Sequence, residues 1–221
     1  NFSVPTGNFG DVYAGYLSKK MGLPINKLIV ATNKNDILHR AISTGKYEVE
    51  TVFETNSPSM DIQVASNFER LIYDLNDFDD IETKDVMIKI KDEGKYIFAK
   101  NRLEKIRKDF LSESMNEEEV IETIRNIYNK YKVILDPHTA IGLGALNKIN
   151  IEGDNIVLAT AHPCKFPDAI DKSISIKPSL PSELQYIMDK KEYYDIVPNN
   201  VSKTKQYIKD KLKWSWEKMK I

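Results

Sequence analysis

A glycine-containing loop near the start of the chain restricts the possible folds more than any other feature of the sequence. Residues 2–5 (FSVP) predict the end of a strand, and residues 6–10 (TGNFG) predict a tight loop. A helix is predicted from Asp11, as its N-cap, to about residue 20, because apolar residues recur there at helical spacing. Glycines at a strand-to-helix corner let backbone N–H groups converge on an anion such as a phosphate, although such a loop can also be a purely structural turn.

The order of strand, loop and helix then repeats along the chain. Residues 27–32 (KLIVAT) are typical of a buried parallel strand, and residues 36–44 predict a helix. The same order returns near the other end, with strands predicted at residues 132–135 and 155–160 around a helix at residues 140–147. These two units predict an α/β fold with an open, mainly parallel sheet and helices on both of its faces.

The remaining segments have helical character. We assign residues 1–176 to the α/β domain and interpret residues 62–131 within it as a helical excursion. A capping box is expected at Ser114 and Glu117, at the start of the last helix of the excursion. Residues 177–221 are interpreted as a helical C-terminal extension of one or two helices that ends at Trp214, Trp216 and Ile221. Its lysines alternate with apolar residues, for which we expect a solvated face over a packed face. The apolar residues are Val201, Tyr207, Ile208, Leu212 and Trp216.

Composition excludes several classes of protein. The chain has 221 residues, of which 41% are hydrophobic and 29% charged, so it can bury a sizeable core. No apolar run is long enough to span a membrane, and the net charge of −1 gives no reason to expect nucleic acid or an anionic membrane as a partner. The single cysteine, Cys164, fits a reducing compartment, and we expect a cytoplasmic protein.

Two polar clusters follow predicted strands. Residues 136–139 (DPHT) and 160–163 (TAHP) lie where strands of the second unit end, and ligands of open parallel sheets bind at the carboxyl ends of strands. We therefore expect both clusters to share one crevice with the glycine loop. His138, His162 and Cys164 lack the spacing of a known zinc site, so no metal is expected.

A further polar stretch admits two interpretations. Residues 55–61 (TNSPSMD) and 66–70 (SNFER) form a loop rich in hydroxyls and amides that leads into a helix, which suits a polar substrate. An ordinary helix cap with a surface arginine explains the same residues.

Five blocks, taken in order, resemble the C-terminal portion of the threonine synthase family. They are VPTGNFGDVYAGYLSKKMGLP, IVATNKND, SPSMDIQVASNFER, DPHTAIG and TAHPCKFPDAI, and they span residues 2 to about 170. The resemblance implies the pyridoxal-phosphate fold that the family shares with the tryptophan synthase β-subunit. It also implies the conversion of O-phospho-L-homoserine and water to L-threonine and phosphate, with pyridoxal phosphate as the cofactor.

The resemblance carries site residues with it. By their place in the family's motif, the residues implied to grip the cofactor phosphate are Gly7, Asn8, Phe9, Gly10 and Asp11. Thr160 is implied to lie beside the pyridine nitrogen, where a neutral hydroxyl need not enforce protonation of the ring. Substrate-side roles are implied for Asn33, Asp61, Arg70, His138 and Lys165.

The family's lysine that forms a Schiff base with the cofactor lies in a Ser-Phe-Lys-Asp type motif, which does not occur here. The chain begins at Asn1, inside a predicted strand, and we expect the lysine in an N-terminal half of the same polypeptide, so that this chain alone is inactive. The alternatives are another lyase of the same fold, such as a serine or threonine dehydratase, and a non-catalytic phosphate-binding fragment. The oligomeric state is not implied.

Overall fold

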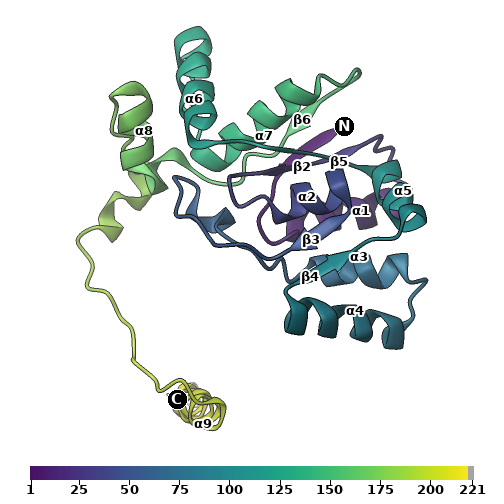
Figure 1. Cartoon of the computed structure of the whole chain (residues 1–221). Coiled ribbons are helices and arrows are strands. Elements are labelled where there is room, and N and C mark those ends of the chain that lie inside the picture. The colour runs from purple at the N-terminus through teal and green to yellow at the C-terminus, as the bar shows by residue number, and fades with distance from the viewer. Residues whose placement is uncertain (219–221) are drawn as a thin grey trace. The chain divides into compact units, whose positions relative to one another are not determined.

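A computed structural model describes residues 1–218 of the chain, with side-chain surroundings given up to residue 212. Two compact units are distinguished: the first is Asn1–Ser179, and the second begins at Leu180. The first unit is built on a four-stranded parallel sheet with helices on both faces, which confirms the predicted α/β class (Figure 1). Its strands lie in the order β5 (Phe110–Ser114), β2 (Leu28–Thr32), β1 (Phe2–Pro5) and β6 (Ile156–Val157).

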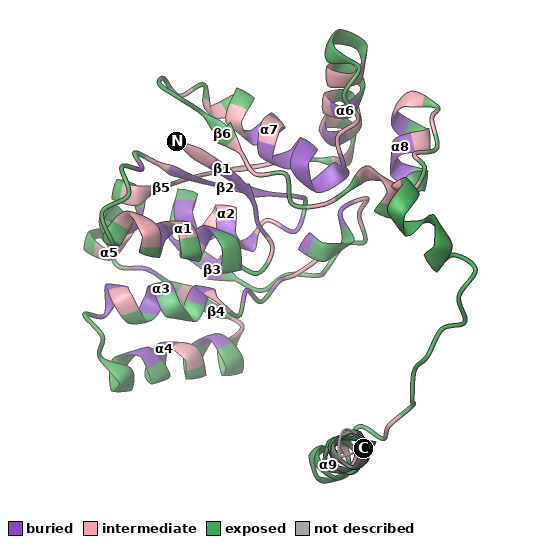
Figure 2. Cartoon of the chain, turned by 180° about the vertical axis from the view of Figure 1, so that it is seen from behind, coloured by how far each residue is buried: buried purple, intermediate pink, exposed green. Residues whose placement is uncertain are grey.

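The centre of this sheet is buried on both sides. All five residues of β2 are buried, and β2 pairs in parallel with β1, where Phe2 lies opposite Leu28 and Pro5 opposite Ala31. Successive side chains of a strand point to opposite faces, so a strand with no exposed residue must be covered on both. Figure 2 shows this buried centre in purple.

Helices from the two ends of the unit cover the two faces (Figure 1). On one face, α1 (Gly10–Lys20) and α2 (Ile37–Thr44) share a core cluster with Leu28 and Val30 of β2. On the other face, α7 (Pro137–Ile149) shares a second cluster with Ala31. Successive side chains of β2 point to opposite faces of the sheet and therefore contribute to two separate hydrophobic cores.

The remaining elements surround this framework. The helices are α3 (Phe68–Leu75), α4 (Asp80–Glu93), α5 (Lys100–Asp109), α6 (Glu117–Tyr131) and α8 (Pro167–Ile174). Short 3-10 segments are η1 (Pro58–Met60) and η2 (Pro163–Lys165). A small antiparallel sheet joins β3 (Lys46–Glu48) to β4 (Lys95–Ile97). No helix among residues 1–218 combines the length and the apolar character needed to cross a membrane.

One predicted strand was wrong. Residues 132–135 form no strand, and the strand that joins the sheet on the far side of β2 is β5, inside the stretch interpreted as helical. Ile134 and Leu135 pack against the second core cluster without taking part in a ladder. The predicted strand at residues 155–160 is present only as the two residues of β6.

Two predicted caps were also misplaced. The N-cap of α1 is Phe9 and not Asp11, which lies in the first turn. The capping box of α6 is formed by Asn116 and Glu119 instead of Ser114 and Glu117, because Ser114 is the last residue of β5.

The second unit consists of a 3-10 segment, η3 (Ser182–Ile187), and the helix α9 (Val201–Lys218). Its large apolar side chains up to residue 212 are mostly exposed, including Ile196 and Val201 at 88% and 72%. No packed face is therefore found within the described part of this unit. The side chains of Trp214 and Trp216, and Ile221 as a whole, lie outside the described residues.

The strand order places a reversal of chain direction beside β1. From β1 the chain proceeds through β2 to β5 on one side, and it then returns to place β6 on the other side of β1. In open parallel sheets, the crevice for a ligand lies outside the carboxyl ends of strands at such a switch point. The glycine loop follows β1, and residues 158–161 follow β6, so both lead into this region.

Candidate functional site

The glycine loop ends in a backbone conformation that is unusual for a bulky residue. Phe9 adopts the left-handed region, with φ 64° and ψ 8°, and caps α1 without a side-chain hydrogen bond. Its ring is fully buried and lies 5.0 Å from the ring of Phe68 and 5.6 Å from that of Phe110, measured between centroids. Because the left-handed conformation costs about 1–2 kcal/mol, aromatic packing must hold Phe9 in place.

The backbone of the loop presents a row of unused donors. The N–H groups of residues 7–12 donate no hydrogen bond within the described chain, and the first bond of this turn runs from the Tyr13 N–H to the Phe9 carbonyl at 3.1 Å. A helix N-terminus with free N–H groups carries a partial positive charge and binds anions. The loop therefore has the hydrogen-bond donors that a phosphate site needs.

Close packing requires glycine at the start of the loop. A Cβ atom on Gly7 would lie 2.8 Å from the Cα atom of Met60 and 3.1 Å from the carbonyl oxygen of Ser59, both of which belong to the backbone. Real Cβ atoms essentially never lie within 3.0 Å of another heavy atom, so a larger residue would separate the loop from Met60. The loop is thus pressed against the segment that carries Ser59 and Met60.

The side chain of Asn8 joins the loop to the start of α3. Its Oδ1 atom accepts hydrogen bonds from the backbone N–H and the hydroxyl of Ser66, at 2.7 and 2.8 Å. Asp11 is exposed in the first turn of α1, where its carboxylate interacts favourably with the helix dipole.

A cavity of about 250 Å³ opens in front of the loop. Its walls come from the loop, from the segments before α3, from the start of α7 and from the chain after β6. The lining residues are Pro5, Thr6, Gly7, Asn8, Phe9, Gly10, Asp11, Ser59, Met60, Asn67, His138, Thr160, Ala161 and Lys165. Both predicted polar clusters therefore contribute to one crevice with the loop, His138 from the first cluster and Thr160 from the second.

Asp136 organises the first turn of α7. It is 1% exposed, and as N-cap it accepts hydrogen bonds from the backbone N–H groups of His138 (2.9 Å) and Thr139 (3.3 Å) and from the hydroxyl of Thr139. Burial acts to raise the pKa of Asp136, but the hydrogen bonds from His138 and Thr139 together outweigh burial and lower that pKa below its ordinary value. Asp136 is therefore held as a carboxylate.

Thr160 and Lys165 form the exposed side of the cavity. The hydroxyl of Thr160 makes no hydrogen bond within residues 1–212, and Lys165 forms no ion pair there. The Nζ atom of Lys165 lies 5.8 Å from the centroid of the Phe166 ring. Both side chains are thus available to a ligand.

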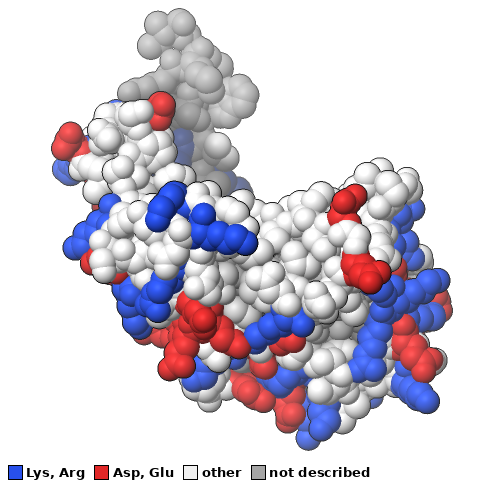
Figure 3. Space-filling model, turned by 90° about the horizontal axis from the view of Figure 1, so that it is seen from above, with Lys and Arg blue, Asp and Glu red and all other residues white. Residues whose placement is uncertain are grey.

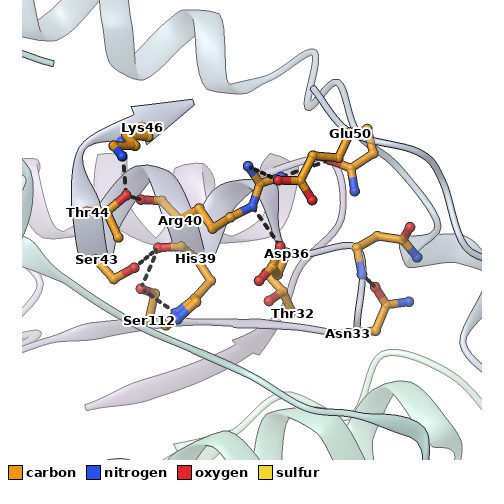
Figure 4. Close-up of polar contacts among 12 residues, drawn as sticks. Thr32, Asn33, Asp36, His39, Arg40, Ser43, Thr44, Lys46, Glu50 and Ser112 are labelled. Atoms are coloured by element: carbon orange, nitrogen blue, oxygen red, sulfur yellow. Dashed lines mark hydrogen bonds and ion pairs between the residues drawn. The ribbon is translucent and has the colours of Figure 1, made fainter. Parts of the chain in front are cut away.

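Asn33 and Asp61 come together, but away from the cavity. The Nδ2 atom of Asn33 donates to Asp61 Oδ1 at 2.8 Å and lies 2.9 Å from the hydroxyls of Thr55 and Ser57. The Nδ2 atom of Asn35 also donates to Asp61, and the Thr55 N–H donates to the second carboxylate oxygen of Asp61. Figure 4 shows Asn33 after β2. We call these five residues the amide–carboxylate network.

Polar contacts of α2 attach this helix to neighbouring segments of the chain. Arg40 donates to Asp36 at 2.8 Å and lies 3.0 Å from Glu50 (Figure 4). His39 lies 3.1 Å from the hydroxyl of Ser112 on β5. These contacts attach α2 to its neighbours and do not reach the cavity.

Arg70 and His162 lie outside the cavity. Arg70 is exposed in an open groove of about 700 Å³ between α3 and α4. His162 is exposed, and its Nδ1 atom accepts a hydrogen bond from the Cys164 N–H at 3.2 Å.

On the molecular face shown in Figure 3, basic and acidic side chains are interspersed and neither sign of charge dominates.

Sequence reasoning included Ser59, Met60 and Asn67 only as members of a polar stretch and did not place them beside the glycine loop. They line the cavity because the chain folds back on the loop, which no local pattern indicates. Asp136 was named as part of the polar cluster 136–139 but not as a helix N-cap, although an aspartate directly before a proline is frequent at that position.

Comparisons with known proteins agree on one family. A sequence model described as "Threonine synthase, C-terminal" matches residues 139–208. Threonine synthase from Pseudomonas aeruginosa is 42% identical over 94% of this chain and 45% of its own length, and that from Saccharomyces cerevisiae is 42% identical over 96% of this chain and 46% of its own length.

The fold agrees as well. A crystal structure of PLP-bound threonine synthase from Brucella melitensis superposes with a TM-score of 0.86 at 42% identity, covering 94% of this chain and 45% of that one. The chain thus spans about half the length of the relatives it matches. In sequence and in fold, this chain is a relative of the threonine synthases and corresponds to their C-terminal part.

Proposed function

We propose that this chain supplies the C-terminal part of a pyridoxal-phosphate-dependent threonine synthase, which converts O-phospho-L-homoserine and water to L-threonine and phosphate. The observation that carries the proposal is the row of unused N–H groups of residues 7–12 at the edge of a cavity. Donors at a helix N-terminus suit a phosphate, and pyridoxal phosphate brings one. The similarity to a PLP-bound threonine synthase supports the choice of cofactor.

The residues present fit the cofactor. The backbone of Gly7, Asn8, Phe9, Gly10 and Asp11 would hold its phosphate, and the free hydroxyl of Thr160 would meet its ring nitrogen. When bound, pyridoxal phosphate supplies an electron sink for negative charge that develops on the substrate carbons. A hydroxyl at the ring nitrogen donates or accepts a hydrogen bond without carrying charge.

The substrate-side residues divide by position. His138 and Lys165 line the cavity and are proposed to contact the substrate directly. Asn33 and Asp61 are proposed to act indirectly, because their hydrogen bonds fix the segment that leads to Ser59 and Met60. Arg70 lines the separate groove between α3 and α4, so a contact between Arg70 and the substrate would have to be made from that groove.

The whole reaction needs a lysine that these residues do not supply. In this family the cofactor is anchored by a lysine in a Ser-Phe-Lys-Asp type motif, and that motif is absent from the sequence. We propose that an upstream segment of the same polypeptide provides the lysine and completes the site. On this proposal, the chain alone binds phosphate but has no turnover.

The test measures phosphate release and L-threonine formation from O-phospho-L-homoserine by a polypeptide that joins this chain to its upstream sequence, with pyridoxal phosphate bound. Both products are expected in equal amounts. Ammonia release from L-serine or L-threonine, without phosphate release from O-phospho-L-homoserine, would assign a dehydratase instead. No turnover of any of these compounds would leave a phosphate-binding protein.

A second arm tests the loop itself. Gly7→Val should lower the affinity for pyridoxal phosphate at least tenfold, because its side chain would force the loop away from Met60 and Ser59. His162→Ala is the matched control, since His162 is exposed and does not line the cavity, and its affinity should stay within twofold. Equal losses in a cofactor titration would argue against the loop as the phosphate site.

A further inference from the structure

The ring of His138 has one polar atom without a partner. His138 is 4% exposed, and its Nε2 atom is buried and makes no hydrogen bond within the described residues. Most buried polar side-chain atoms in folded proteins have a partner, and an exception calls for an explanation such as a ligand. His138 is also one of the residues that line the cavity in front of the glycine loop.

The opposite side of the ring is fixed. Nδ1 of His138 lies 3.2 Å from Asp136 Oδ1, and Asp136 is held by three further hydrogen bonds from the first turn of α7. Because a carboxylate only accepts hydrogen bonds, Nδ1 must carry the proton, and Nε2 is the nitrogen left for another partner. The ring is held in addition by Phe166, whose centroid lies 4.7 Å away.

The cavity favours an anion as that partner. Lys165 contributes an ammonium group without a carboxylate partner among residues 1–212, and the helix α1 directs its N-terminus and free N–H groups into the same space. Asp11 is the acidic residue of the lining, and it sits on the first turn of α1. The N–H groups of the first turn of α7 are already taken by Asp136, so on this side of the cavity the imidazole is the free group.

We propose that Asp136 and His138 form a pair that binds a phosphate group in the cavity, in which Asp136 positions the ring and Nε2 of His138 accepts a hydrogen bond from a protonated oxygen of the phosphate. This phosphate contact is separate from the glycine loop and is assisted by Lys165. The inference rests on the proposed function in one respect. It takes the bound phosphate to be that of the substrate, a phosphate monoester, and not that of the cofactor. His138 is then a substrate-binding residue and Asp136 a positioning residue.

The experiment titrates inorganic phosphate into the whole protein that carries this chain, with and without saturating pyridoxal phosphate, and follows the ¹⁵N signals of the histidine side chains. Phosphate is expected to shift the Nε2 signal of His138 while the cofactor occupies the loop. No shift at saturating phosphate would overturn the proposal. A shift that disappears once the cofactor is bound would also overturn it, because the two phosphates would then compete for one site.

Substitutions separate binding from packing. His138→Phe keeps a ring against Phe166 and removes Nε2, and it should weaken phosphate binding at least tenfold while the affinity for pyridoxal phosphate stays within twofold. His138→Gln, whose terminal amide can reach a similar position, should restore part of the affinity. Unchanged phosphate affinity in both variants would overturn the proposal, and so would an equal loss for phosphate and cofactor.

Asp136→Asn tests the positioning role. An amide can donate as well as accept, so it no longer forces the proton onto Nδ1, and the ¹⁵N signals of His138 should report a mixture of tautomers together with weaker phosphate binding. Retention of a single tautomer would remove Asp136 from the proposal. His162→Phe, at a histidine outside the cavity, is the control that should change neither measurement.

These measurements require no turnover. If the joined polypeptide fails to release phosphate from O-phospho-L-homoserine but His138 still responds to phosphate, the proposed reaction fails and the phosphate contact stands. If turnover is observed while His138 does not respond, the reverse holds.

Discussion

Phe9 shows how a single residue can serve the site and the core at the same time. Its backbone turns the chain from β1 into α1 and leaves the loop N–H groups unpaired, while its ring is fully buried against Phe68 and Phe110. The glycines predicted the loop correctly, but the cap was assigned to Asp11 because propensity favours aspartate there. A phenylalanine in the left-handed region depends on tertiary packing, which propensity does not contain.

A pair of substitutions at Phe9 separates the two roles. Phe9→Ala and Phe9→Gly both lose the buried ring, at a cost of about 3–5 kcal/mol. The glycine variant should be about 1 kcal/mol more stable than the alanine variant, because glycine adopts positive φ without strain. The free energy of unfolding in urea measures the difference.

The control lies in the same helix. Tyr16 is buried in the interior of α1, where glycine should be less stable than alanine by about 1 kcal/mol. An alanine variant of Phe9 that is the more stable of the two would mean that the left-handed conformation does not persist without the ring.

Among the elements, the edge strand β5 marks where sequence patterns fail. Its sequence, FLSES, contains only two apolar residues, since an edge strand pairs on one side and tolerates polar residues facing outward. Residues 132–135 (KVIL) are more apolar and still form no strand, because β2 already pairs with β5 and β1. β1, β2, α1 and α2, by contrast, follow from local patterns to within one residue or two.

The segment between β3 and α3 depends on hydrogen bonds instead of regular secondary structure. The amide–carboxylate network holds residues 53–61 against the end of β2, and it thereby places Ser59 and Met60 at the cavity. The sequence identified this stretch as polar and suited to a substrate. The partners of Asn33 could not be derived from it, because they lie 22 to 28 residues away.

Asp61→Ala tests this network. The change removes the acceptor of Asn33, Asn35 and Thr55 and should lower the free energy of unfolding by about 2–3 kcal/mol, because buried donors are left without partners. The affinity for phosphate should fall as well, since Met60 packs on Gly7. Asp92→Ala, at an exposed site on α4, should change stability by less than about 0.5 kcal/mol. Similar values for both variants in urea unfolding would contradict a structural role of the network.

For the molecule as a whole, the site depends on segments far apart in the sequence. The loop after β1, the segment before α3, the start of α7 and the chain after β6 all line one cavity. Parallel strands bring their carboxyl ends to one edge of the sheet, which is why the sequence placed residues 6–11, 138 and 160 together correctly. Every buried residue of the described chain lies in the first unit, before residue 180.

Removal of the second unit should therefore leave the first intact. A chain ending at Ser179 should keep a melting temperature within about 3 °C of the longer chain, because residues 180–212 contribute no buried apolar side chain. Polar contacts in that stretch, such as the ion pair of Lys211 with Asp195 at 2.8 Å, join residues of the second unit to one another. Circular dichroism during heating measures the transition, and phosphate titration of the shortened chain reports whether the cavity survives. A much lower melting temperature, or loss of phosphate binding, would mean that the second unit covers part of the first.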